Sequence, residues 1–477
     1  MDAALFERRT TQPDGITDKI RIGVLSSTPD RTYIWNRHHL ADKAVFLRPL
    51  PVLRKGAKRL RAEGADVVLV LAHMGFPLVD EGVQAQNELT EVAEIPEVDA
   101  VIGGHTHQRF PDGSNTCFDE TGQLKGLVNG TPVVQPGAAG SDLGQIRITL
   151  KKEKDGTGWQ IKKAESFLAQ TRPDTIEDES VNWFAAKAHR ETIAYLERPA
   201  AKIAKPMNTY FALARPSPVQ ALMATAKRHI IAKTVEGTGL ADLPLIAAAS
   251  AALTGGLDGP ENFISLPAGE IKYRHIAGLN PYANQVWAVR ATGARIIDWL
   301  ERSAMIFNTL VEDNPDQILI NPNIPGFRYD AILGLSYVID PRELPRFDDA
   351  GRRLPERTGR NSSVTWQGQP LDPNMNFLVA TTDHRAGGGG IYQPFEGGEI
   401  VVKGTAPLPE ALLDYLKNPS CDEIRSARPW RLEPRMGRSA VLLSSPEAVR
   451  HLNEISDLSP QPCGLDKEGF LKIRLHL

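Results

Sequence analysis

The fold of the first part of the chain is decided by one stretch of sequence, Val67-Val68-Leu69-Val70-Leu71-Ala72-His73. Its first five residues form an unbroken apolar run rich in valine, which is typical of a strand buried on both faces. The preceding residues, 52–63, carry apolar side chains at the helical period, and Gly64 suits the end of a helix. Further strand patterns occur at residues 20–25, 99–102, 132–134 and 144–150. Strands that alternate with helices over short connections predict an α/β fold.

The composition is that of a globular protein, with 477 residues of which 41% are hydrophobic and 24% are charged. The formal net charge is only −3. No basic field therefore attracts nucleic acid or an anionic membrane surface, and we expect neither as a partner. The apolar runs are too short to span a bilayer. Three widely spaced cysteines indicate neither a disulfide framework nor a zinc knuckle, namely Cys117, Cys421 and Cys463.

Two domains and two smaller segments are predicted along the chain. Residues 1–165 carry the alternating strand and helix pattern. A helical segment followed by prolines indicates a linker helix and hinge at residues 166–203. Residues 204–435 are predicted to form a second domain of the α+β class, and residues 436–477 are predicted to be a polar tail.

Histidines follow two of the predicted strands of the first domain. His73 is the last residue of the opening stretch, and Gly103-Gly104-His105-Thr106-His107 comes directly after the strand at 99–102. Side chains at the carboxyl ends of such strands collect in a crevice held by the sheet, and glycines allow the backbone to approach a metal or phosphate closely. Each motif alone is compatible with ordinary loop histidines. Together they predict an imidazole-rich site for zinc, manganese or iron.

Two tyrosines of the second domain lie in loops next to predicted strands. Tyr282 lies in Pro281-Tyr282-Ala283-Asn284, and Tyr392 follows the four glycines 387–390. Glycines leave backbone N–H groups free to face a ligand. Two aromatic rings can hold a planar base between them, and such stacking contributes about 1–3 kcal/mol per base. The alternative is a mobile glycine loop with two partly buried tyrosines.

The ordered set of motifs resembles the 5′-nucleotidase/2′,3′-cyclic-nucleotide phosphodiesterase family of metallophosphoesterases, and within it the 2′,3′-cyclic-nucleotide 2′-phosphodiesterase/3′-nucleotidase branch. In the first domain the resemblance is carried by Leu71-Ala72-His73-Met74-Gly75, Gly103-Gly104-His105-Thr106-His107 and Pro132-Val133-Val134-Gln135-Pro136-Gly137. In the second domain it is carried by Pro281-Tyr282-Ala283-Asn284, Gly326-Phe327-Arg328-Tyr329-Asp330 and Arg385-Ala386-Gly387-Gly388. The similarity runs in order from about residue 20 to residue 400.

The resemblance implies part of a four-layer metallophosphoesterase sandwich, followed by a 5′-nucleotidase-type domain that binds the nucleoside. His73 and His105 would ligate one divalent metal, and His107 would ligate a second. The resemblance also implies stacking and hydrogen-bonding contacts to the base from Tyr282, Tyr392 and Asn284. The chemistry implied is that of nucleotide catabolism, the hydrolysis of a phosphate ester by metal-activated hydroxide.

Three metal motifs of the family are absent, because the chain contains no Asp-x-His, Gly-Asp or Asn-His sequence. Two dications about 4 Å apart repel by about 16 kcal/mol at an effective dielectric of about 20, and neutral histidines offset none of this. We therefore expect an N-terminally truncated first domain with no catalytic general acid and with impaired hydrolysis. We also expect the strand at 67–71 to have unpaired apolar edges.

The sequence leaves three functional interpretations open. The chain is a phosphoesterase-family hydrolase with impaired activity, a non-catalytic nucleotide- or nucleoside-binding protein, or half of a split enzyme completed by a partner chain. Relatives of this type are usually periplasmic. If Met1 is the true start, the chain lacks a signal peptide and we expect it in the cytoplasm.

Overall fold

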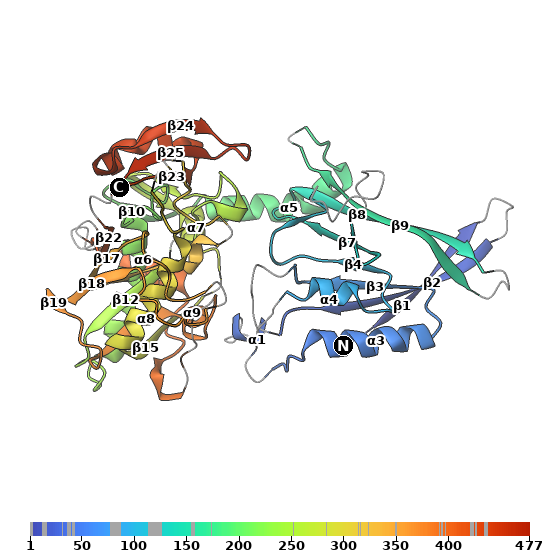
Figure 1. Ribbon diagram of the computed structural model, residues 1–477, viewed down its shortest axis with the longest axis horizontal. Helices are drawn as coiled ribbons and strands as arrows, with labels where there is room; N and C mark the ends of the chain where they lie inside the picture. The colour runs from blue at the N-terminus through green and yellow to red at the C-terminus, as the bar shows by residue number, and fades with distance from the viewer. Residues whose placement is uncertain are drawn as a thin grey trace. The chain divides into compact units, whose positions relative to one another are not determined.

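The computed structural model describes residues 3–477 except for 12–16, 31, 36–39, 41–42, 77–86, 113–125, 154–157, 173, 251, 283, 313, 315, 323, 349–350, 391, 393–394, 396, 420–423, 425–426 and 434–436. The chain divides into two units (Figure 1). The first unit comprises Met1–Tyr33 and His39–Glu177, and the second comprises Ile34–His38 and Asp178–Leu477.

The first unit is built on one sheet whose strands follow the order β1–β2–β3–β4–β7–β5, with β6 beside β7. The strands are β1 (Ala4–Thr11), β2 (Thr17–Ser27), β3 (Val67–Ala72), β4 (Ala100–Ile102), β5 (Arg109–Phe110), β6 (Leu127–Val128) and β7 (Thr131–Pro136). Strands β2, β3, β4 and β7 pair in parallel. This is the arrangement that alternating strands and helices produce.

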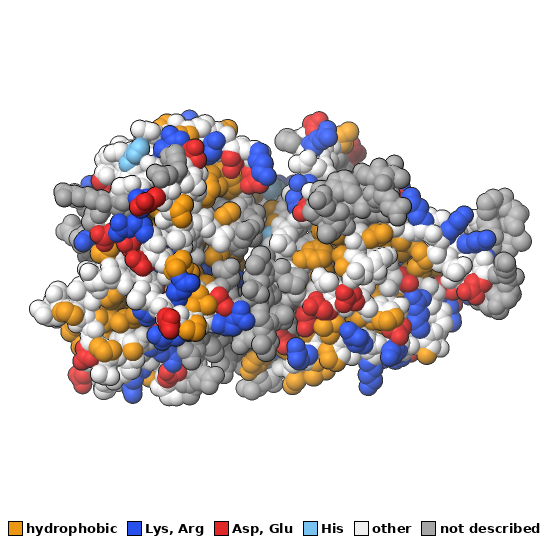
Figure 2. Space-filling model, viewed as in Figure 1, with side chains coloured by type: hydrophobic (Ala, Val, Ile, Leu, Met, Phe, Trp, Pro, Cys, Tyr) orange, Lys and Arg blue, Asp and Glu red, His pale blue; other side chains and the backbone are white. Residues whose placement is uncertain are grey.

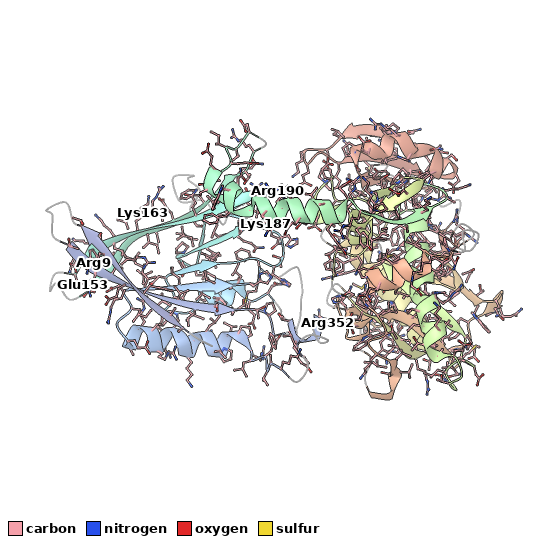
Figure 3. All side chains as sticks on the ribbon, turned by 180° about the vertical axis from the view of Figure 1, so that it is seen from behind. Arg9, Glu153, Lys163, Lys187, Arg190 and Arg352 are labelled. Atoms are coloured by element: carbon pink, nitrogen blue, oxygen red, sulfur yellow. The ribbon has the colours of Figure 1, made fainter. Side chains whose placement is uncertain are left out.

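Strand β3 has a neighbour on each side, so the expectation of unpaired apolar edges is wrong. β2 pairs with one side of β3, and β4 pairs with the other. All of β1 pairs in antiparallel register with β2, from Thr17 to Val24 of β2. The edge at this end of the sheet belongs to β1, where Glu7, Arg8 and Arg9 are exposed. Figure 3 labels Arg9 on this strand. Charged side chains on an edge strand disfavour the addition of another strand.

Helices cover one face of this sheet. Leu53 and Leu60 of α3 (Pro49–Ala62) are buried in one cluster with Val68 and Val70 of β3, and α4 (Leu89–Ala93) joins the same cluster. A Cβ on Gly23 of β2 would lie 2.9 Å from a methyl carbon of Leu60. The glycine therefore lets α3 lie close against β2. The unit also contains a hairpin of β8 (Asp142–Lys152) and β9 (Trp159–Gln170), which contacts β7. The short helix α1 (Thr32–Trp35) is divided between the two units.

The second unit begins with a long exposed helix, α5 (Glu179–Leu196). Asp178 caps it, because its Oδ1 accepts hydrogen bonds from the backbone N of Ser180 and of Val181 at 2.8 and 3.1 Å. None of its residues is buried, and Lys187 and Arg190 lie along it (Figure 3). The helix falls within the segment that the sequence assigns to a linker.

A central sheet forms the body of the second unit, with the order β19–β18–β17–β16–β12–β20–β15–β21 and with β22 beside β17. Alternate residues of its inner strands enter two separate cores. Ile246 and Ala248 of β12 face one core with α8 (Gly293–Ser303), whereas Ala247 and Ala249 face the other with α6 (Pro218–Val235). The sheet is therefore buried between helices on both faces.

The strands of this sheet are β12 (Leu245–Ser250), β15 (Val286–Thr292), β16 (Asp330–Leu333), β17 (Leu335–Ile339), β18 (Asn361–Trp366), β19 (Gln369–Pro370), β20 (Asn376–Thr382), β21 (Ile400–Val402) and β22 (Trp430–Leu432). Smaller pairs are formed by β10 (Pro199–Ile203) with β14 (Gly269–Lys272) and by β11 (Met207–Asn208) with β13 (Ser265–Leu266). The remaining helical segments are η3 (Gly256–Asp258), α7 (Tyr273–Leu279), η4 (Ala304–Ile306), η5 (Gly326–Arg328), α9 (Asp383–Ala386), η6 (Gly397–Glu399) and α10 (Leu408–Tyr415).

The C-terminal residues fold into the second unit, which differs from the polar tail expected at 436–477. β23 (Ser439–Ser444), β24 (Gln461–Leu465) and β25 (Leu471–His476) form a sheet in the order β23–β25–β24, with η7 (Pro446–Leu458) between β23 and β24. Leu442, Ile473 and Leu475 belong to the core that contains α8. Alternation places these apolar side chains on one face of short strands, and the charged residues between them give the segment its polar composition.

Charged side chains of both signs are mixed on the face of the molecule that Figure 2 shows. In the part of the chain that the structure describes, no helix is both long and apolar enough to cross a bilayer. Figure 2 shows Lys and Arg side chains interspersed with Asp and Glu over the visible face. This mixture agrees with the small net charge.

Candidate functional site

The structure brings two of the predicted histidines together at the carboxyl edge of the first sheet. His73 directly follows β3, and His105 follows the neighbouring parallel strand β4. Their ring centroids lie 5.3 Å apart, and the ring planes are inclined by 60°. His105 is partly buried, whereas His73 and His107 are exposed. The sequence prediction of adjacent imidazoles rested on the same property, because parallel strands end at one edge.

The loop after β4 has an unusual backbone. His105 has a φ of 71° and His107 a φ of 58°, so both lie in the left-handed region, which is uncommon for residues other than glycine. Each such residue costs on the order of 1–3 kcal/mol and persists only where its surroundings hold it. Thr106 between them is buried, and its N–H donates to the carbonyl of Gly104 at 2.8 Å.

Tight packing holds this loop in place. The Nε2 of buried Gln135 donates to Thr106 Oγ1 at 2.6 Å. A Cβ on Gly75 would lie 1.9 Å from the same oxygen, so only glycine fits there. Asn87 Oδ1 accepts a hydrogen bond from the N–H of Gly75 at 3.0 Å. The loops after β3 and β4 are thus locked against each other, which fixes the positions of the histidines.

The environment keeps His105 uncharged. Burial, together with the charges of His73 and His107, lowers the pKa of His105 to about 4. The imidazole is then neutral at physiological pH, which is the form that ligates metals.

The donor set does not fit a two-metal centre. Among the described residues, no group of three or more histidine, cysteine, aspartate or glutamate side chains is placed to hold a metal ion. The imidazoles carry no negative charge, and two dications need carboxylates to offset their repulsion. Asp80 and Glu81 lie outside the described residues. The described residues therefore support no metal-dependent step.

Tyr282 offers an aromatic surface in the second unit. It is 48% exposed, and its ring meets that of Phe327 with centroids 6.1 Å apart and planes inclined by 70°. Asn280 Nδ2 donates to the carbonyl of Tyr282 at 2.6 Å, which fixes the loop. Partial burial and the nearby charge of Asp258 raise the pKa of the Tyr282 hydroxyl. Asn284 lies in the same loop, and its carbonyl accepts from the N–H of Leu408 at 2.9 Å.

Tyr392 is placed differently, because it is only 7% exposed. Its hydroxyl shares a hydrogen bond of 2.7 Å with Ser303 Oγ and donates to the carbonyl of Arg328 at 2.6 Å. The guanidinium of Arg385 lies 3.9 Å from its ring centroid. Burial is the main reason that its pKa is raised. This burial differs from an accessible loop position, and the stacking of Tyr282 and Tyr392 on one base stays a prediction.

Arg385 connects the loops around Tyr282 and Tyr392. Its Nη2 donates to the carbonyl of Phe327 at 2.8 Å, and its Nη1 donates to the carbonyl of Gly389 at 2.7 Å. The same guanidinium forms an ion pair with Asp330, in which both side chains are almost fully buried. The sequence motifs that contain Phe327, Asp330 and Arg385 carry the family resemblance, but nothing in the sequence assigns these residues a role.

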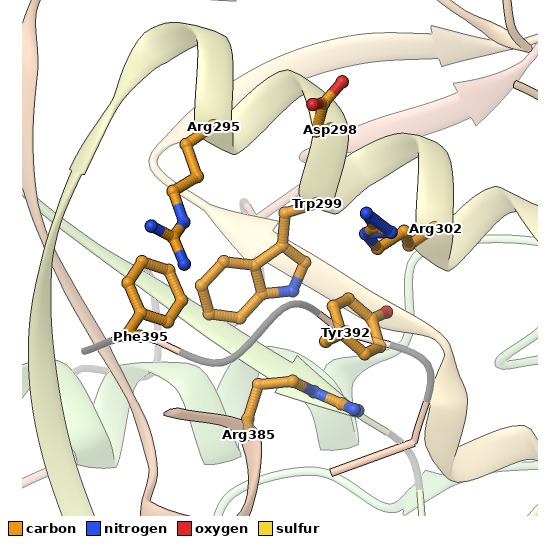
Figure 4. A pocket seen from close by; sticks show the side chains of 7 residues that line it. All are labelled: Arg295, Asp298, Trp299, Arg302, Arg385, Tyr392 and Phe395. Atoms are coloured by element: carbon orange, nitrogen blue, oxygen red, sulfur yellow. The ribbon is translucent and has the colours of Figure 1, made fainter. Parts of the chain in front are cut away.

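A hollow of about 300 Å³ adjoins this cluster (Figure 4). It is lined by Arg295, Asp298, Trp299, Arg302, Arg385, Tyr392 and Phe395. Trp299 and Tyr392 are almost fully buried beneath it, so their ring faces are already covered by protein.

Known protein families match both halves of the chain. The calcineurin-like phosphoesterase family model matches residues 12–109, and the 5′-nucleotidase C-terminal domain model matches residues 201–397. Two solved structures share the fold. A Staphylococcus aureus protein described as a 5′-nucleotidase has a TM-score of 0.64 at 19% identity, covering 90% of this chain and 74% of its own. The 5′-nucleotidase precursor of Thermus thermophilus has a TM-score of 0.52 at 18% identity, covering 90% and 75%.

Curated relatives are nucleotide phosphoesterases. The 2′,3′-cyclic-nucleotide 2′-phosphodiesterase/3′-nucleotidase of Salmonella typhimurium is 31% identical over 80% of this chain and 60% of its own length. The protein of the same description from Haemophilus influenzae is 25% identical over 99% and 74%. The trifunctional nucleotide phosphoesterase protein YfkN of Bacillus subtilis is 26% identical over 95% of this chain but only 31% of its own length. The chain thus spans less than two thirds of the Salmonella and Bacillus relatives.

The predicted fold and family are therefore confirmed. The chain is a two-domain α/β protein in which a calcineurin-like phosphoesterase region precedes a 5′-nucleotidase C-terminal domain. It is a member of the 5′-nucleotidase family of metallophosphoesterases, and its curated relatives include 2′,3′-cyclic-nucleotide 2′-phosphodiesterase/3′-nucleotidases.

Proposed function

We propose that this chain binds a nucleotide through its second unit and that its hydrolysis of the phosphate ester is impaired when the chain acts alone. The substrate class is that of the curated relatives, the 2′,3′-cyclic and 3′-nucleotides. The exposed ring of Tyr282 supports binding of the base. The observation that carries the impairment is the histidine site, where neighbouring His73 and His105 have no described carboxylate to complete a metal group.

The metal requirement is part of this proposal. Zinc or manganese at His73, His105 and His107 suits the chemistry of neutral imidazoles. A pair of such ions would need carboxylates in addition to these three side chains.

Two measurements on the full chain test the proposal. Isothermal titration calorimetry with AMP is expected to show binding that Tyr282→Ala weakens. Phosphate release from 3′-AMP and 2′,3′-cyclic AMP, with manganese or zinc added, is expected to stay far below the 1–10³ s⁻¹ typical of enzymes. If the wild-type chain turns over in that range and His105→Ala abolishes this turnover, the proposed impairment is refuted. Absence of AMP binding would refute the binding.

A second candidate function is favoured by exposed apolar residues on the face of the first sheet opposite α3. Phe6, Leu71 and Ile102 are 43%, 43% and 42% exposed. The strand registers place all three on one face, because Phe6 pairs with Ile22, Ile22 pairs with Val67, and Leu71 pairs with Ile102. We propose, as this alternative, that a partner chain bearing the missing acidic motifs covers this face and completes the enzyme.

A complementation assay distinguishes the two candidates. The chain is mixed with a separately produced polypeptide that carries the Asp-x-His, Gly-Asp and Asn-His segments of a relative. A split enzyme is expected to gain phosphate release with manganese, and Leu71→Asp is expected to prevent this gain. If complex formation and activity are both unchanged by mixing, the partner candidate is wrong.

A further inference from the structure

We propose that the helix-covered face of the first unit binds a second copy of this chain through two bands of opposite charge. The basic band consists of Arg54, Lys55 and Lys58 on α3, and the acidic band consists of Glu91, Glu94 and Glu97 on and directly after α4. Each band of one copy contacts the opposite band of the other copy. The inference concerns association of the chain with itself and does not depend on the proposed nucleotide binding.

The basic band lies on the solvent side of α3. The apolar side chains of this helix are buried on its other side, whereas all three cations of the band are exposed. The helix contains no acidic residue. Arg59 forms an ion pair with Glu63, and Arg61 forms one with Asp99. Within the described part of the chain, the three cations of the band form no such pair.

The basic band is unfavourable for α3 by itself. Arg54 and Lys58 are four residues apart, as are Lys55 and Arg59, and like charges at this spacing on a helix repel each other. Cations in the last turn of a helix are favourable because they interact with its dipole, but this effect fades beyond that turn. All three residues of the band precede the last turn. An anionic partner would offset the repulsion between them.

The acidic band lies beside the basic band on the same face of the sheet. α3 and α4 contact each other and share one core cluster (Figure 1). Glu94 is exposed, and Glu91 and Glu97 are partly exposed. Glu94 Oε1 accepts a hydrogen bond from Asn129 Nδ2 at 2.6 Å. No cation among the described residues forms an ion pair with the acidic band, so the two bands do not neutralise each other within one chain.

Neighbouring bands of opposite charge make this face complementary to itself. In a dimer with a two-fold axis, a contact from one residue to another is always accompanied by the reciprocal contact. Rotation of a second copy therefore places its acidic band over the first basic band and its basic band over the first acidic band. Exposed ion pairs are individually weak and are screened by salt. We therefore expect a reversible dimer that dissociates as the ionic strength rises.

Analytical ultracentrifugation of the full chain tests the dimer. An increase in salt from about 0.1 M to about 1 M shortens the Debye length from about 10 Å to about 3 Å. The chain is expected to dimerise at the lower salt concentration and to dissociate at the higher one. A chain that stays monomeric at the lower salt concentration, up to the highest soluble protein concentration, would overturn the proposal. A dimer that persists unchanged at the higher salt concentration would overturn it as well.

Charge reversal of each band tests which surfaces meet. Arg54→Glu/Lys58→Glu and Glu91→Lys/Glu94→Lys are each expected to weaken dimerisation by at least about tenfold, because attraction becomes repulsion in both halves of the interface. Circular dichroism shows which variants fold. If Glu91→Lys/Glu94→Lys does not fold, Glu94→Lys alone takes its place, since Glu94 is exposed. Dimerisation that neither reversal weakens would refute these two bands as the interface.

A mixture of the two reversed variants gives the sharpest test. One variant then has two acidic bands and the other has two basic bands, so the mixture is expected to form heterodimers although neither variant dimerises well alone. Absence of heterodimers from folded variants would refute the reciprocal contact.

The control for net charge is Lys187→Glu/Arg190→Glu on the exposed helix α5 (Figure 3). It changes the charge of the chain by the same amount as the reversal of the basic band and is expected to leave dimerisation of the chain unchanged. Its mixture with the acidic-band variant is expected to give fewer heterodimers than the mixture of the two reversed variants, because one of the two contacts would then join cations to cations. Equal heterodimer formation in the two mixtures would show that net charge drives the association, and this would overturn the proposal.

Discussion

Arg385 donates from Nε and Nη2 to the two carboxylate oxygens of Asp330, at 2.7 and 3.2 Å, and the two side chains are only 5% and 4% exposed. A buried ion pair of this kind adds little to the stability of the fold when it is compared with apolar residues of the same shape. Loss of one partner is costly, however, because it leaves the other charge buried and uncompensated. The pair therefore makes the core of the second unit sensitive to single substitutions.

Asp330→Asn is expected to lower the free energy of unfolding of the second unit by about 3–5 kcal/mol, because Arg385 keeps its charge without a counter-ion. Urea denaturation followed by tryptophan fluorescence measures the change. The matched control is Asp348→Asn, which breaks the exposed ion pair with Arg352, and it is expected to cost no more than about 1 kcal/mol. Equal effects of the two substitutions would contradict the importance of burial.

We expect the buried side chain of Lys227 to make the free energy of unfolding depend on pH. This lysine is 3% exposed, its ammonium donates to the carbonyl of Ala248, and burial lowers its pKa from 10.5 to about 8. Between pH 8 and 10.5 the unfolded chain binds more protons than the folded chain, so stability rises with pH. From pH 8 to 9.5 the gain is expected to be about 1.5 kcal/mol.

Urea denaturation at several pH values measures this gain in the second unit. Lys227→Met is expected to abolish the rise, because methionine does not titrate. Lys233→Met, at a lysine 56% exposed on the same helix, is expected to retain it. A rise that persists in Lys227→Met would assign the effect to other groups.

Gly75→Ala is expected to destabilise the first unit by about 2 kcal/mol or more, because the added Cβ would lie 1.9 Å from Thr106 Oγ1 and force the two histidine loops apart. Thermal unfolding followed by circular dichroism measures the loss. Gly104→Ala is the matched control, since its Cβ would meet nothing closer than His73 Nδ1 at 3.6 Å. A control that loses as much stability as Gly75→Ala would show that the clash is not the cause.

His107→Asn is expected to stabilise the first unit by on the order of 0.5–1 kcal/mol, because asparagine tolerates the left-handed backbone found at this exposed residue. Urea denaturation of the first unit is the measurement. His189→Asn, on the exposed helix α5, is the control and is expected to change stability little, since histidine and asparagine have similar helix propensities. Destabilisation by His107→Asn would show that the imidazole makes contacts that outweigh the backbone strain.

The sequence was sufficient to predict the inner strands of the first sheet and the meeting of His73 with His105. An unbroken apolar run has few other structures open to it, and the carboxyl ends of neighbouring parallel strands meet at one edge. β1 could not be predicted in this way, because residues such as Glu7, Arg8 and Arg9 give an edge strand the composition of a loop.

The aromatic site shows a second limit of sequence reasoning. A loop tyrosine next to four glycines looks accessible, and Tyr392 was therefore expected to stack on a base. Its burial depends on Arg385 and Ser303, which lie on separate elements of the second unit. Which aromatic residue faces solvent is decided by such distant contacts, and local composition does not reveal them.

The pairing of β1 with β2 limits how the first unit can associate with other polypeptides. Since a charged strand already occupies that border, strand addition there is disfavoured, and a newcomer meets the exposed apolar side chains of Phe6, Leu71 and Ile102 on the face of the sheet instead. Association of this face-on kind ends once the surface is covered. The architecture thus favours closed complexes of fixed size over fibres that grow without limit.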